Sequence, residues 1–346
     1  MITTDRTDQL AERLFAATLG ALELFSVYLG TELGLYKTLE REGALTPDEL
    51  ADRAGIAPRY SREWLEQQAV AGLLDHEDGR FALSPAHARV LTHADDPAHV
   101  APFAHMLAGI GGVLPRVAEA YRSGGGVPYE QYGYEFRHGQ GHINRPAFVN
   151  ELPAEWIDAM PDIRARLEQG GRVADVGCGQ GFSTAAMARR FPLARVAGYD
   201  ADPASIADAR RHADGTGASF AIGDATAVRD RGPYDLVLVL EVLHDLPHPV
   251  ETLAAVRSSL APGGAALIVD ERVAEQFGAP GDEVERMMYG WSVTHCLPTQ
   301  MVDQPTAALG TVLRPGTVRE LAGAAGYASV DVLPVENDFF RLYRLS

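Results

Sequence analysis

The sequence predicts an α/β protein, with a Rossmann-like parallel sheet in the second half of the chain and a mostly helical domain before it. Residues 166–346 alternate short apolar runs with amphipathic stretches, as strands joined by crossover helices do. Residues 1–95 are mostly helical, and residues 96–165 combine a helix with a loop rich in glycine and tyrosine. We therefore expect a helical domain at 1–95, a linker that doubles as a lid at 96–165, and the α/β domain at 166–346.

The bulk properties narrow the class of protein. A hydrophobic fraction of 46% is ordinary for a folded globular chain of 346 residues. We see no apolar run approaching the roughly 18 residues of a membrane span, and no apolar signal core at the N-terminus. We therefore expect a cytoplasmic protein without a membrane partner. Two cysteines, Cys178 and Cys296, are too few for a disulfide framework and lack the spacing of zinc ligands.

The helical domain has the pattern of a winged helix. Thr46 and Glu49 form a capping-box opening, and the short helix that follows ends at Gly55. A second helix is expected over about 58–71. Two short apolar runs then flank Asp78-Gly79, a hairpin turn signal. The order helix, turn, helix, hairpin predicts a winged-helix domain.

The charge of this domain argues against DNA binding. Residues 46–85 contain four arginines and eight acidic residues, and the whole chain has a net charge of −17. Nucleic acid is bound by basic surfaces, so we expect no nucleic-acid partner. The preceding helices, around 12–40, are apolar on much of their circumference, which is typical of buried helices. We therefore expect residues 1 to about 45 to hold a homodimer together.

The strongest signal for function is the turn after the first predicted strand of the α/β domain. The segment 172–176 is a short apolar strand, and Gly177, Gly179 and Gly181 follow it before a helix begins. Glycine at such a turn lets the backbone approach a ligand closely. The spacing G-x-G-x-G differs from the dinucleotide fingerprint G-x-G-x-x-G, whose last position holds Phe182 here. Asp175, two residues before the first glycine, makes the signal more specific.

Acidic residues stand at the ends of the next two predicted strands, where they could contact a nucleoside. Asp200 ends the second strand, nineteen residues after Gly181, where an acid can hold ribose hydroxyls. Asp224 ends the third strand, where it could meet an adenine edge. The fourth strand, beginning at Tyr234, is continuously apolar, as a buried parallel strand should be. A fifth follows Pro262, and two further runs near the end form a hairpin-like pair.

In residues 166–346 the sequence resembles the class I S-adenosylmethionine-dependent methyltransferases. The motifs that carry the resemblance are DVGCGQG at 175–181, Asp200, Asp224, Tyr234-Asp235 and LAPGG at 260–264. The family implies a seven-stranded sheet with its last strand antiparallel. With the winged helix included, the chain resembles natural-product O-methyltransferases of secondary metabolism and related mycobacterial winged-helix methyltransferases.

The resemblance implies a set of contacts with S-adenosyl-L-methionine. These contacts are Asp175, Gly177, Gly179 and Gly181 toward the methionine part, Asp200 toward the ribose, Asp224 and Ala225 toward the adenine, and Glu241 after the fourth strand as a further cofactor contact. Each acid alone could also be an ordinary turn residue, since strand ends favour aspartate. Their joint spacing favours the cofactor interpretation.

The resemblance also implies a general base. The O-methyltransferases use a His-Asp pair just after the fourth strand, and His244-Asp245 stands at that position in EVLHDLPHP. The family's tryptophan-containing continuation is absent, and the segment is shorter. A carboxylate at the end of the fifth strand positions the histidine in that family, and Asp270 or Glu271 occupies that place. A loop histidine that caps the strand end is the alternative.

Two segments are expected to shape the substrate pocket. A helix beginning at Asp282 would place Met287, Trp291 and His295 on one stripe, with core packing as the alternative for Met287.

The second segment is the loop 124–146, whose Tyr129 and Tyr132, with Tyr134 and His138, could close over the cofactor. A plain surface connection is the alternative. His138 and His142 lie among glycines without a clear helix, so we expect no metal site.

These signals together predict a methyltransferase acting on a small molecule, most readily at a hydroxyl, with nitrogen or carbon acceptors open. One alternative is a transcription regulator whose methyltransferase-like domain senses a ligand. Another is a cofactor-binding protein of this fold that catalyses a different reaction. The acidic winged helix argues against the first alternative, and the His244-Asp245 pair argues against the second.

Overall fold

The computed structural model describes residues 6–346 and divides the chain into two compact units. One unit contains the described residues up to Gly111 together with Tyr134–Pro146. The other contains Gly112–Gly133 and Ala147–Ser346. The first five residues of the domain expected at 1–95 lie outside the described residues. The segment expected as a linker, 96–165, contributes to both units.

The first unit has the predicted winged-helix order. Its elements are α1 (Arg6–Glu32), α2 (Leu35–Glu42), α3 (Pro47–Ala54), α4 (Pro58–Val70), β1 (Asp75–Glu77), β2 (Arg80–Ala82) and α5 (Pro85–Leu91). Both hydrogen bonds of the capping box form, because the Glu49 amide donates to the Thr46 hydroxyl and the Thr46 amide donates to the Glu49 carboxylate. The hairpin turns at Asp78-Gly79, both with positive φ.

Helix α1 corrects the expectation that no apolar run is long enough to cross a membrane. By length and composition alone this 27-residue helix is apolar enough to do so, because Glu23 is the one charge between Leu14 and Thr31. Within the described chain its apolar side chains are largely exposed: Leu10, Leu14, Phe15, Leu19, Leu22, Phe25 and Leu29. A long helix with such exposed apolar side chains also suits an interface between subunits.

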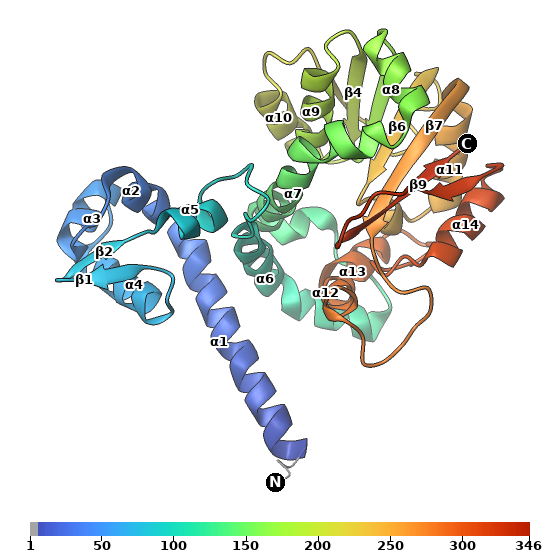
Figure 1. Ribbon diagram of the computed structural model, residues 1–346. Coiled ribbons are helices and arrows are strands. Elements are labelled where there is room, and N and C mark those ends of the chain that lie inside the picture. Colours follow the sequence, from blue (N-terminus) through green and yellow to red (C-terminus); the bar gives the residue numbers. More distant parts are fainter. Residues whose placement is uncertain (1–5) are drawn as a thin grey trace. The chain divides into compact units, whose positions relative to one another are not determined.

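The second unit contains the predicted seven-stranded sheet, in the order β5-β4-β3-β6-β7-β9-β8 (Figure 1). The strands are β3 (Arg172–Val176), β4 (Arg195–Asp200), β5 (Ser219–Ile222), β6 (Tyr234–Leu240), β7 (Leu260–Glu271), β8 (Val330–Val332) and β9 (Phe340–Leu345). Strands β3 to β7 are parallel, and β9 is antiparallel to both of its neighbours, β7 and β8. The predicted fold class is therefore confirmed, and the carboxyl ends of β3, β4, β6 and β7 meet at one edge.

Helices cover both faces of this sheet. Alternate residues of β6 point to opposite faces, so Leu236 and Leu238 belong to one core while Val237 and Val239 belong to the other. The first core includes side chains of α8 (Pro161–Glu168) and α9 (Phe182–Arg190), and the second those of α11 (Pro249–Ser258) and α14 (Pro315–Ala324). Helix α10 (Pro203–His212) follows β4. Burial on both faces explains why β6 reads as a continuous apolar run.

The segment 124–146 is mostly helical, which corrects the expectation of a glycine-rich loop. After α6 (Pro102–Ser123) comes a short 3-10 turn, η1 (Tyr129–Tyr132), and then α7 (Gly133–Asn150), which carries His138 and His142. A Cβ at Gly139 would lie 2.7 Å from backbone atoms of α6. The glycine that suggested a loop therefore permits close packing of two helices.

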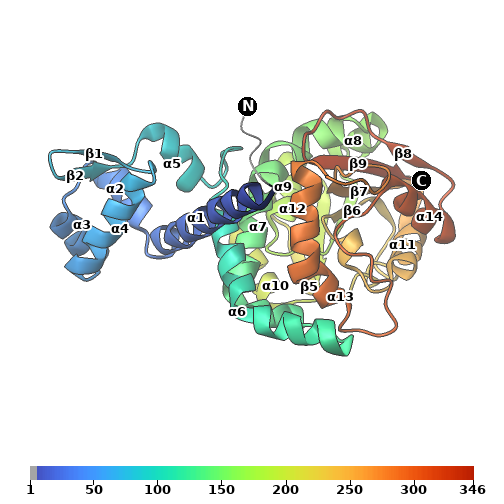
Figure 2. The same cartoon turned by 90° about the horizontal axis from the view of Figure 1, so that it is seen from below.

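The helix expected to begin at Asp282 is interrupted. Helix α12 (Glu283–Trp291) passes into a π-helical turn, η4 (Ser292–Cys296), and then into α13 (Leu297–Gln300); Figure 2 shows them as one continuous rod. The stripe expected for Met287, Trp291 and His295 assumed regular α-helical spacing, and the wider π turn changes that register after Trp291. His295 is buried, whereas Met287 and Trp291 are half-buried.

Candidate active site

The glycine turn, residues 175–184, joins β3 to α9. Gly177 has a φ of +71°, and a Cβ there would lie 2.5 Å from the side chain of Val242. Gly181 caps α9 with a φ of +77°. Any larger residue at these two positions would be strained and would collide with its neighbours, so the G-x-G-x-G spacing follows from the geometry of the turn.

Asp175 lies beneath this turn and is 1% exposed. One of its carboxylate oxygens accepts hydrogen bonds from the hydroxyls of Ser183 and Thr184, both at 2.6 Å. Burial raises the pKa of this carboxyl to about 6, against the lowering effect of the two hydroxyls. Asp175 therefore fixes the start of α9 against the end of β3.

Asp200, at the end of β4, holds the other side of the turn. Its two oxygens accept the amide protons of Gly179 and Asp202, each at 2.8 Å. Burial raises its pKa, against these two hydrogen bonds. Because the carboxylate bonds the middle of the glycine turn, the second predicted acid lies next to the first predicted motif.

Asp224 and Ala225 are placed differently. Asp224 lies two residues beyond the end of β5, is exposed, and accepts hydrogen bonds from the amide and hydroxyl of Thr226 at 2.8 and 2.7 Å. These bonds lower its pKa. Its described contacts are those of a turn residue, and the adenine contact expected for Asp224 and Ala225 stays a prediction.

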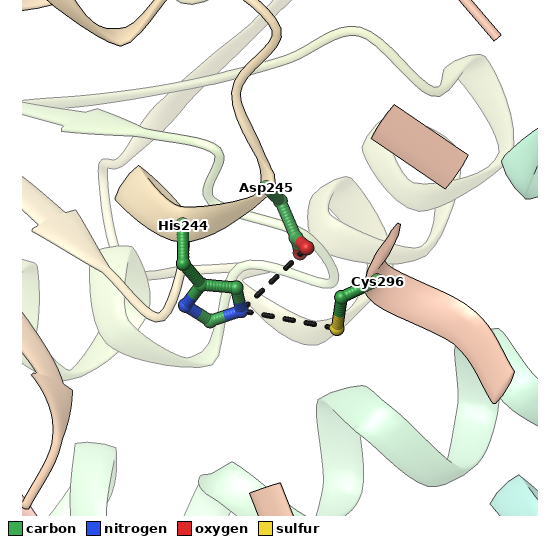
Figure 3. Close-up of side chains that lie close together, drawn as sticks. All are labelled: His244, Asp245 and Cys296. Carbon is green, nitrogen blue, oxygen red and sulfur yellow. Dashed lines mark hydrogen bonds and ion pairs between the residues drawn. The ribbon is translucent and has the colours of Figure 1, made fainter. Parts of the chain in front are cut away.

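His244 is 3% exposed and lies on η3 (Leu243–Asp245), directly after β6. Its Nδ1 forms a short hydrogen bond with Asp270 at the end of β7. Its Nε2 lies 3.5 Å from a carboxylate oxygen of Asp245, as Figure 3 shows. Burial lowers the pKa of the imidazole, but the carboxylates of Asp245, Asp270 and Glu271 outweigh burial and raise it well above 6.5. The three predicted catalytic residues are thus brought together.

Two further buried carboxyl groups adjoin this histidine. Glu271 lies 3.8 Å from Nδ1, and burial raises its pKa to about 7. Glu241, which follows β6 with a φ of +57°, has a pKa raised well above its usual value by burial and then by Glu271 and Asp270. We call Glu241, His244, Asp245, Asp270, Glu271 and Cys296 the His244 cluster.

Residues of η4 and α13 contact His244: Cys296 of η4 lies near its Nε2 atom, and Gln300 of α13 bonds its backbone carbonyl. The sulfur of Cys296 lies 4.0 Å from Nε2 (Figure 3). The side-chain amide of Gln300 donates to the backbone carbonyl of His244 at 2.5 Å, and its oxygen accepts from the amide of Gly310 at 3.0 Å. Gln300 therefore fixes the turn that carries the histidine.

Two of the residues expected in the substrate pocket, Tyr129 and Tyr132, come together around a third, His295. The rings of Tyr132 and Tyr129 meet the His295 ring edge-on, at centroid distances of 4.6 and 5.8 Å. The Tyr132 hydroxyl donates to the carbonyl of Thr294 at 2.9 Å. Burial lowers the pKa of His295 to about 4, so this imidazole is neutral at physiological pH. The group offers flat, largely uncharged surfaces beside Cys296.

Two sets of donor atoms in the described residues are close enough to hold a metal ion. They are His244 with Asp245 and Cys296, and His244 with Asp270 and Glu271, each within 4.8 Å. Both nitrogens of the histidine already have protein neighbours in these sets. The sequence expectation of no metal site stays a prediction.

Several residues of the site were not predicted from the sequence. Thr184 and Gln300 carry no motif and are identified only by their hydrogen bonds to Asp175 and His244. Cys296 was noted only as an isolated cysteine. Its position directly after His295, in a segment already expected to line the pocket, was the available signal.

Two family models match the chain. One, described as a methyltransferase domain, matches residues 167–310, and one described as an Rv2258c-like winged HTH domain matches residues 20–93. The second match confirms the predicted winged helix.

Curated relatives match the chain over different lengths. The trans-aconitate 2-methyltransferase of Methylobacterium radiotolerans is 34% identical over 192 residues, covering 54% of this chain and 70% of the relative. The protein of the same name from Methylobacterium nodulans is 39% identical over 101 residues, covering 29% of this chain and 38% of the relative.

A solved structure resembles the whole chain. Human N-acetylserotonin methyltransferase, in complex with SAM, aligns with 100% of this chain and 99% of its own length, with a TM-score of 0.67 and 18% identity. At this identity the likeness concerns the fold.

Proposed function

The chain belongs to the S-adenosylmethionine-dependent methyltransferases, and we propose that it transfers the methyl group to a hydroxyl of a small molecule. The observation that carries the choice of a hydroxyl is the pair formed by His244 and Asp270. A hydroxyl must lose its proton during methyl transfer, and a histidine held by a carboxylate can accept it.

The glycine turn and the acids around it would hold the cofactor. Gly177, Gly179 and Gly181 present backbone without side chains, and Asp200 stands beside them with a carboxylate that ribose hydroxyls can bond. When bound, the cofactor supplies a methyl group already activated by its sulfonium. What remains for the protein is to align the acceptor and exclude water.

His244 would accept the acceptor's proton at Nε2. Asp270 bonds Nδ1, which keeps the lone pair of the neutral imidazole on Nε2 and stabilises the imidazolium that forms. The raised pKa means that the resting histidine must first release a proton, so turnover should rise with pH through the neutral range. Tyr129, Tyr132 and His295 would give an aromatic acceptor flat surfaces, with half-buried Met287 and Trp291 on the preceding turns.

A two-step experiment tests this proposal. Calorimetry with S-adenosylmethionine should detect one cofactor per chain. A panel of hydroxylated, amine and carbon-nucleophile metabolites is then incubated with protein and cofactor, and mass spectrometry identifies products heavier by one methyl group. We expect hydroxyl acceptors to dominate. Methylation of amines alone would contradict the choice of acceptor, and the absence of cofactor binding would contradict the whole function.

We further propose that the protein is a homodimer joined through α1 and that it does not bind DNA. The exposed apolar side chains of α1 support the dimer, and the acidic charge of the winged helix argues against DNA. Light scattering should give twice the chain mass. Replacing Leu14 and Leu22 by Glu should shift the mass toward the monomer, whereas Leu193→Glu, at an exposed residue of the α/β unit, is the control.

A further inference from the structure

Cys296 is a buried thiol that the proposed methyl transfer does not use. It is 5% exposed and ends the π-helical turn η4. Figure 3 shows its sulfur facing the Nε2 atom of His244, at 4.0 Å. Because Asp270 bonds the opposite nitrogen, sulfur, imidazole and carboxylate form a continuous chain of neighbours. A thiol, a base and a group that orients the base are the parts of an activated cysteine nucleophile.

A second observation comes from Thr311. Its hydroxyl hydrogen-bonds the sulfur of Cys296, which lowers the pKa of the thiol, and the residue is 2% exposed. Within residues 6–346 this hydroxyl has no other hydrogen-bond partner. Placed beside the sulfur, it is available to stabilise negative charge that develops there or on a molecule bound to it.

Cys296 is not a preformed thiolate. Burial and then the Asp245 carboxylate raise the pKa of the thiol to about 12, against the lowering effects of His244 and Thr311. A reaction at this sulfur therefore requires that the proton leave as the new bond forms. The imidazole of His244 lies 4.0 Å from the sulfur and, once mildly alkaline pH has removed its own proton, can accept the thiol proton.

We propose that Cys296 is a covalent attachment site for small carbon electrophiles of the α,β-unsaturated carbonyl class. The sulfur electron pair forms an S–C bond at the β-carbon, and the alkene π pair moves to the carbonyl to give an enolate. The thiol proton passes to Nε2 of His244 and from there to the α-carbon. The addition needs no oxidant, reductant or leaving group.

An adduct on Cys296 has a consequence that rests on the proposed function. It would occupy the space beside Nε2, where the acceptor hydroxyl has to lie. Electrophile addition would then stop methyl transfer while leaving the glycine turn, and with it the cofactor site, unchanged. Because the adduct itself is measured by mass, the covalent chemistry can be tested whether or not the chain methylates a hydroxyl.

Cys178 is a second buried thiol against which the reactivity of Cys296 can be compared. Cys178, in the glycine turn, is 7% exposed and thus as buried as Cys296. Burial raises its pKa well above the usual value, and the nearby carboxylates of Asp175 and Asp200 add to that effect. No imidazole contributes to its pKa. The two cysteines therefore match in exposure and differ in the group beside the sulfur.

The experiment treats the full chain with N-ethylmaleimide at mildly alkaline pH and follows each cysteine by peptide mass spectrometry. We expect Cys296 to react at least about 10-fold faster than Cys178, a modest share of what general bases contribute. The same reaction in guanidinium should give equal rates for both thiols. Equal rates in the folded protein, or faster labelling of Cys178, would overturn the proposal.

Variants identify the cause of the preference. In His244→Asn, which keeps a polar side chain but cannot accept the proton, the rate at Cys296 should fall about 10-fold or more, toward that of Cys178. Asp270→Asn should lower it less. Thermal unfolding and cofactor binding show whether each variant is folded. If both variants are unfolded, the ratio of the labelling rates of Cys296 and Cys178 in the unmodified chain tests the proposal. A folded His244→Asn protein that keeps the full preference would contradict activation by the histidine.

Discussion

The glycine turn and the His244 cluster lie at the same edge of one sheet and are built in opposite ways. In the turn, each acid is satisfied by its own chain: Asp175 accepts from two hydroxyls and Asp200 from two backbone amides. In the His244 cluster, one oxygen each of Asp245 and Asp270 is buried without a hydrogen-bond partner in residues 6–346. The buried carboxyl groups of Glu241 and Glu271 are hydrogen-bonded to each other, which requires a proton on one of them.

The hydrogen bonds of the acids are therefore formed within the chain in the glycine turn and are incomplete in the His244 cluster. A carboxylate whose two oxygens already accept hydrogen bonds from the chain organises the backbone whether or not a ligand is present, and its remaining lone pairs can still bond a ligand. Buried oxygens without partners are costly, and a proton or a bound polar group relieves the cost. The raised pKa values of Glu241 and Glu271 show that protons provide part of this relief in the free protein.

The largest expected effect is the loss of turnover when His244 is replaced. His244→Asn should lower the turnover of a hydroxyl acceptor roughly 100-fold or more, the usual contribution of a general base. Affinity for S-adenosylmethionine should change little, because the turn that holds it is intact. Steady-state kinetics and calorimetry on one preparation check both. Near-normal turnover at neutral pH would leave positioning as the mechanism, and weakened cofactor binding with normal turnover would assign the residue to the cofactor.

The next largest effect concerns the glycine turn and its affinity for the cofactor. Asp200→Ala removes the partner of the Gly179 amide as well as the predicted ribose contact, so cofactor binding should weaken by about 1–3 kcal/mol, roughly 10- to 100-fold. Calorimetry with S-adenosylmethionine measures the change. Unaltered affinity in a folded variant would remove Asp200 from the cofactor site.

A smaller effect is the dependence of the free energy of unfolding on pH. Glu271 in the folded chain keeps its proton up to a pKa of about 7, whereas the unfolded chain loses it near 4.5. The folded state thus binds more protons between these values, and the free energy of unfolding should fall as pH rises through that window. The raised pKa values of Glu241 and His244 act in the same direction, as do those of Asp175 and Asp200 in the glycine turn. Glu271→Gln should reduce the fall by roughly 1–2 kcal/mol, measured by urea unfolding across pH; an unchanged slope would contradict the assignment.

The smallest effect concerns one hydroxyl of the turn. Thr184→Val keeps the shape of the side chain but removes a hydrogen bond to Asp175, so stability should fall by about 1 kcal/mol at neutral pH. Chemical denaturation measures it. Cofactor affinity should stay within a few-fold, since Ser183 still holds the carboxylate. A loss much larger than this would mean that Asp175 cannot be held by one hydroxyl.

Periodicity and turn chemistry explain how much of the fold the sequence predicted. The apolar runs gave the strands because a strand buried on both faces must be apolar throughout, and β6 is such a strand. The glycine spacing gave the turn because positive φ values require it. The sequence predicted that His244 and Asp270 lie close together because His244 comes after β6, Asp270 lies at the end of β7, and these two strands are parallel neighbours.

What the sequence did not reveal depends on contacts between distant segments. The glycines of α7 were read as a loop, yet Gly139 is needed where that helix touches α6. The π turn η4 could not be foreseen from spacing, and it decides that both His295 and Cys296 are buried. Thr184 bonds Asp175, nine residues away along the chain, and Gln300 bonds His244, fifty-six residues away.

The place of β9 in the sheet has a consequence for how the chain is completed during synthesis. Strand β7, which ends in Asp270 and Glu271, pairs on one side with β6 and on the other with β9. Until residues 340–345 leave the ribosome, β7 is an apolar edge strand with unpaired backbone groups, a template for wrong pairing with other chains. The two acids at the end of β7 therefore reach their final setting only once residues 340–345 have paired with this strand. A chain without β9 should be prone to aggregate through the exposed edge of β7.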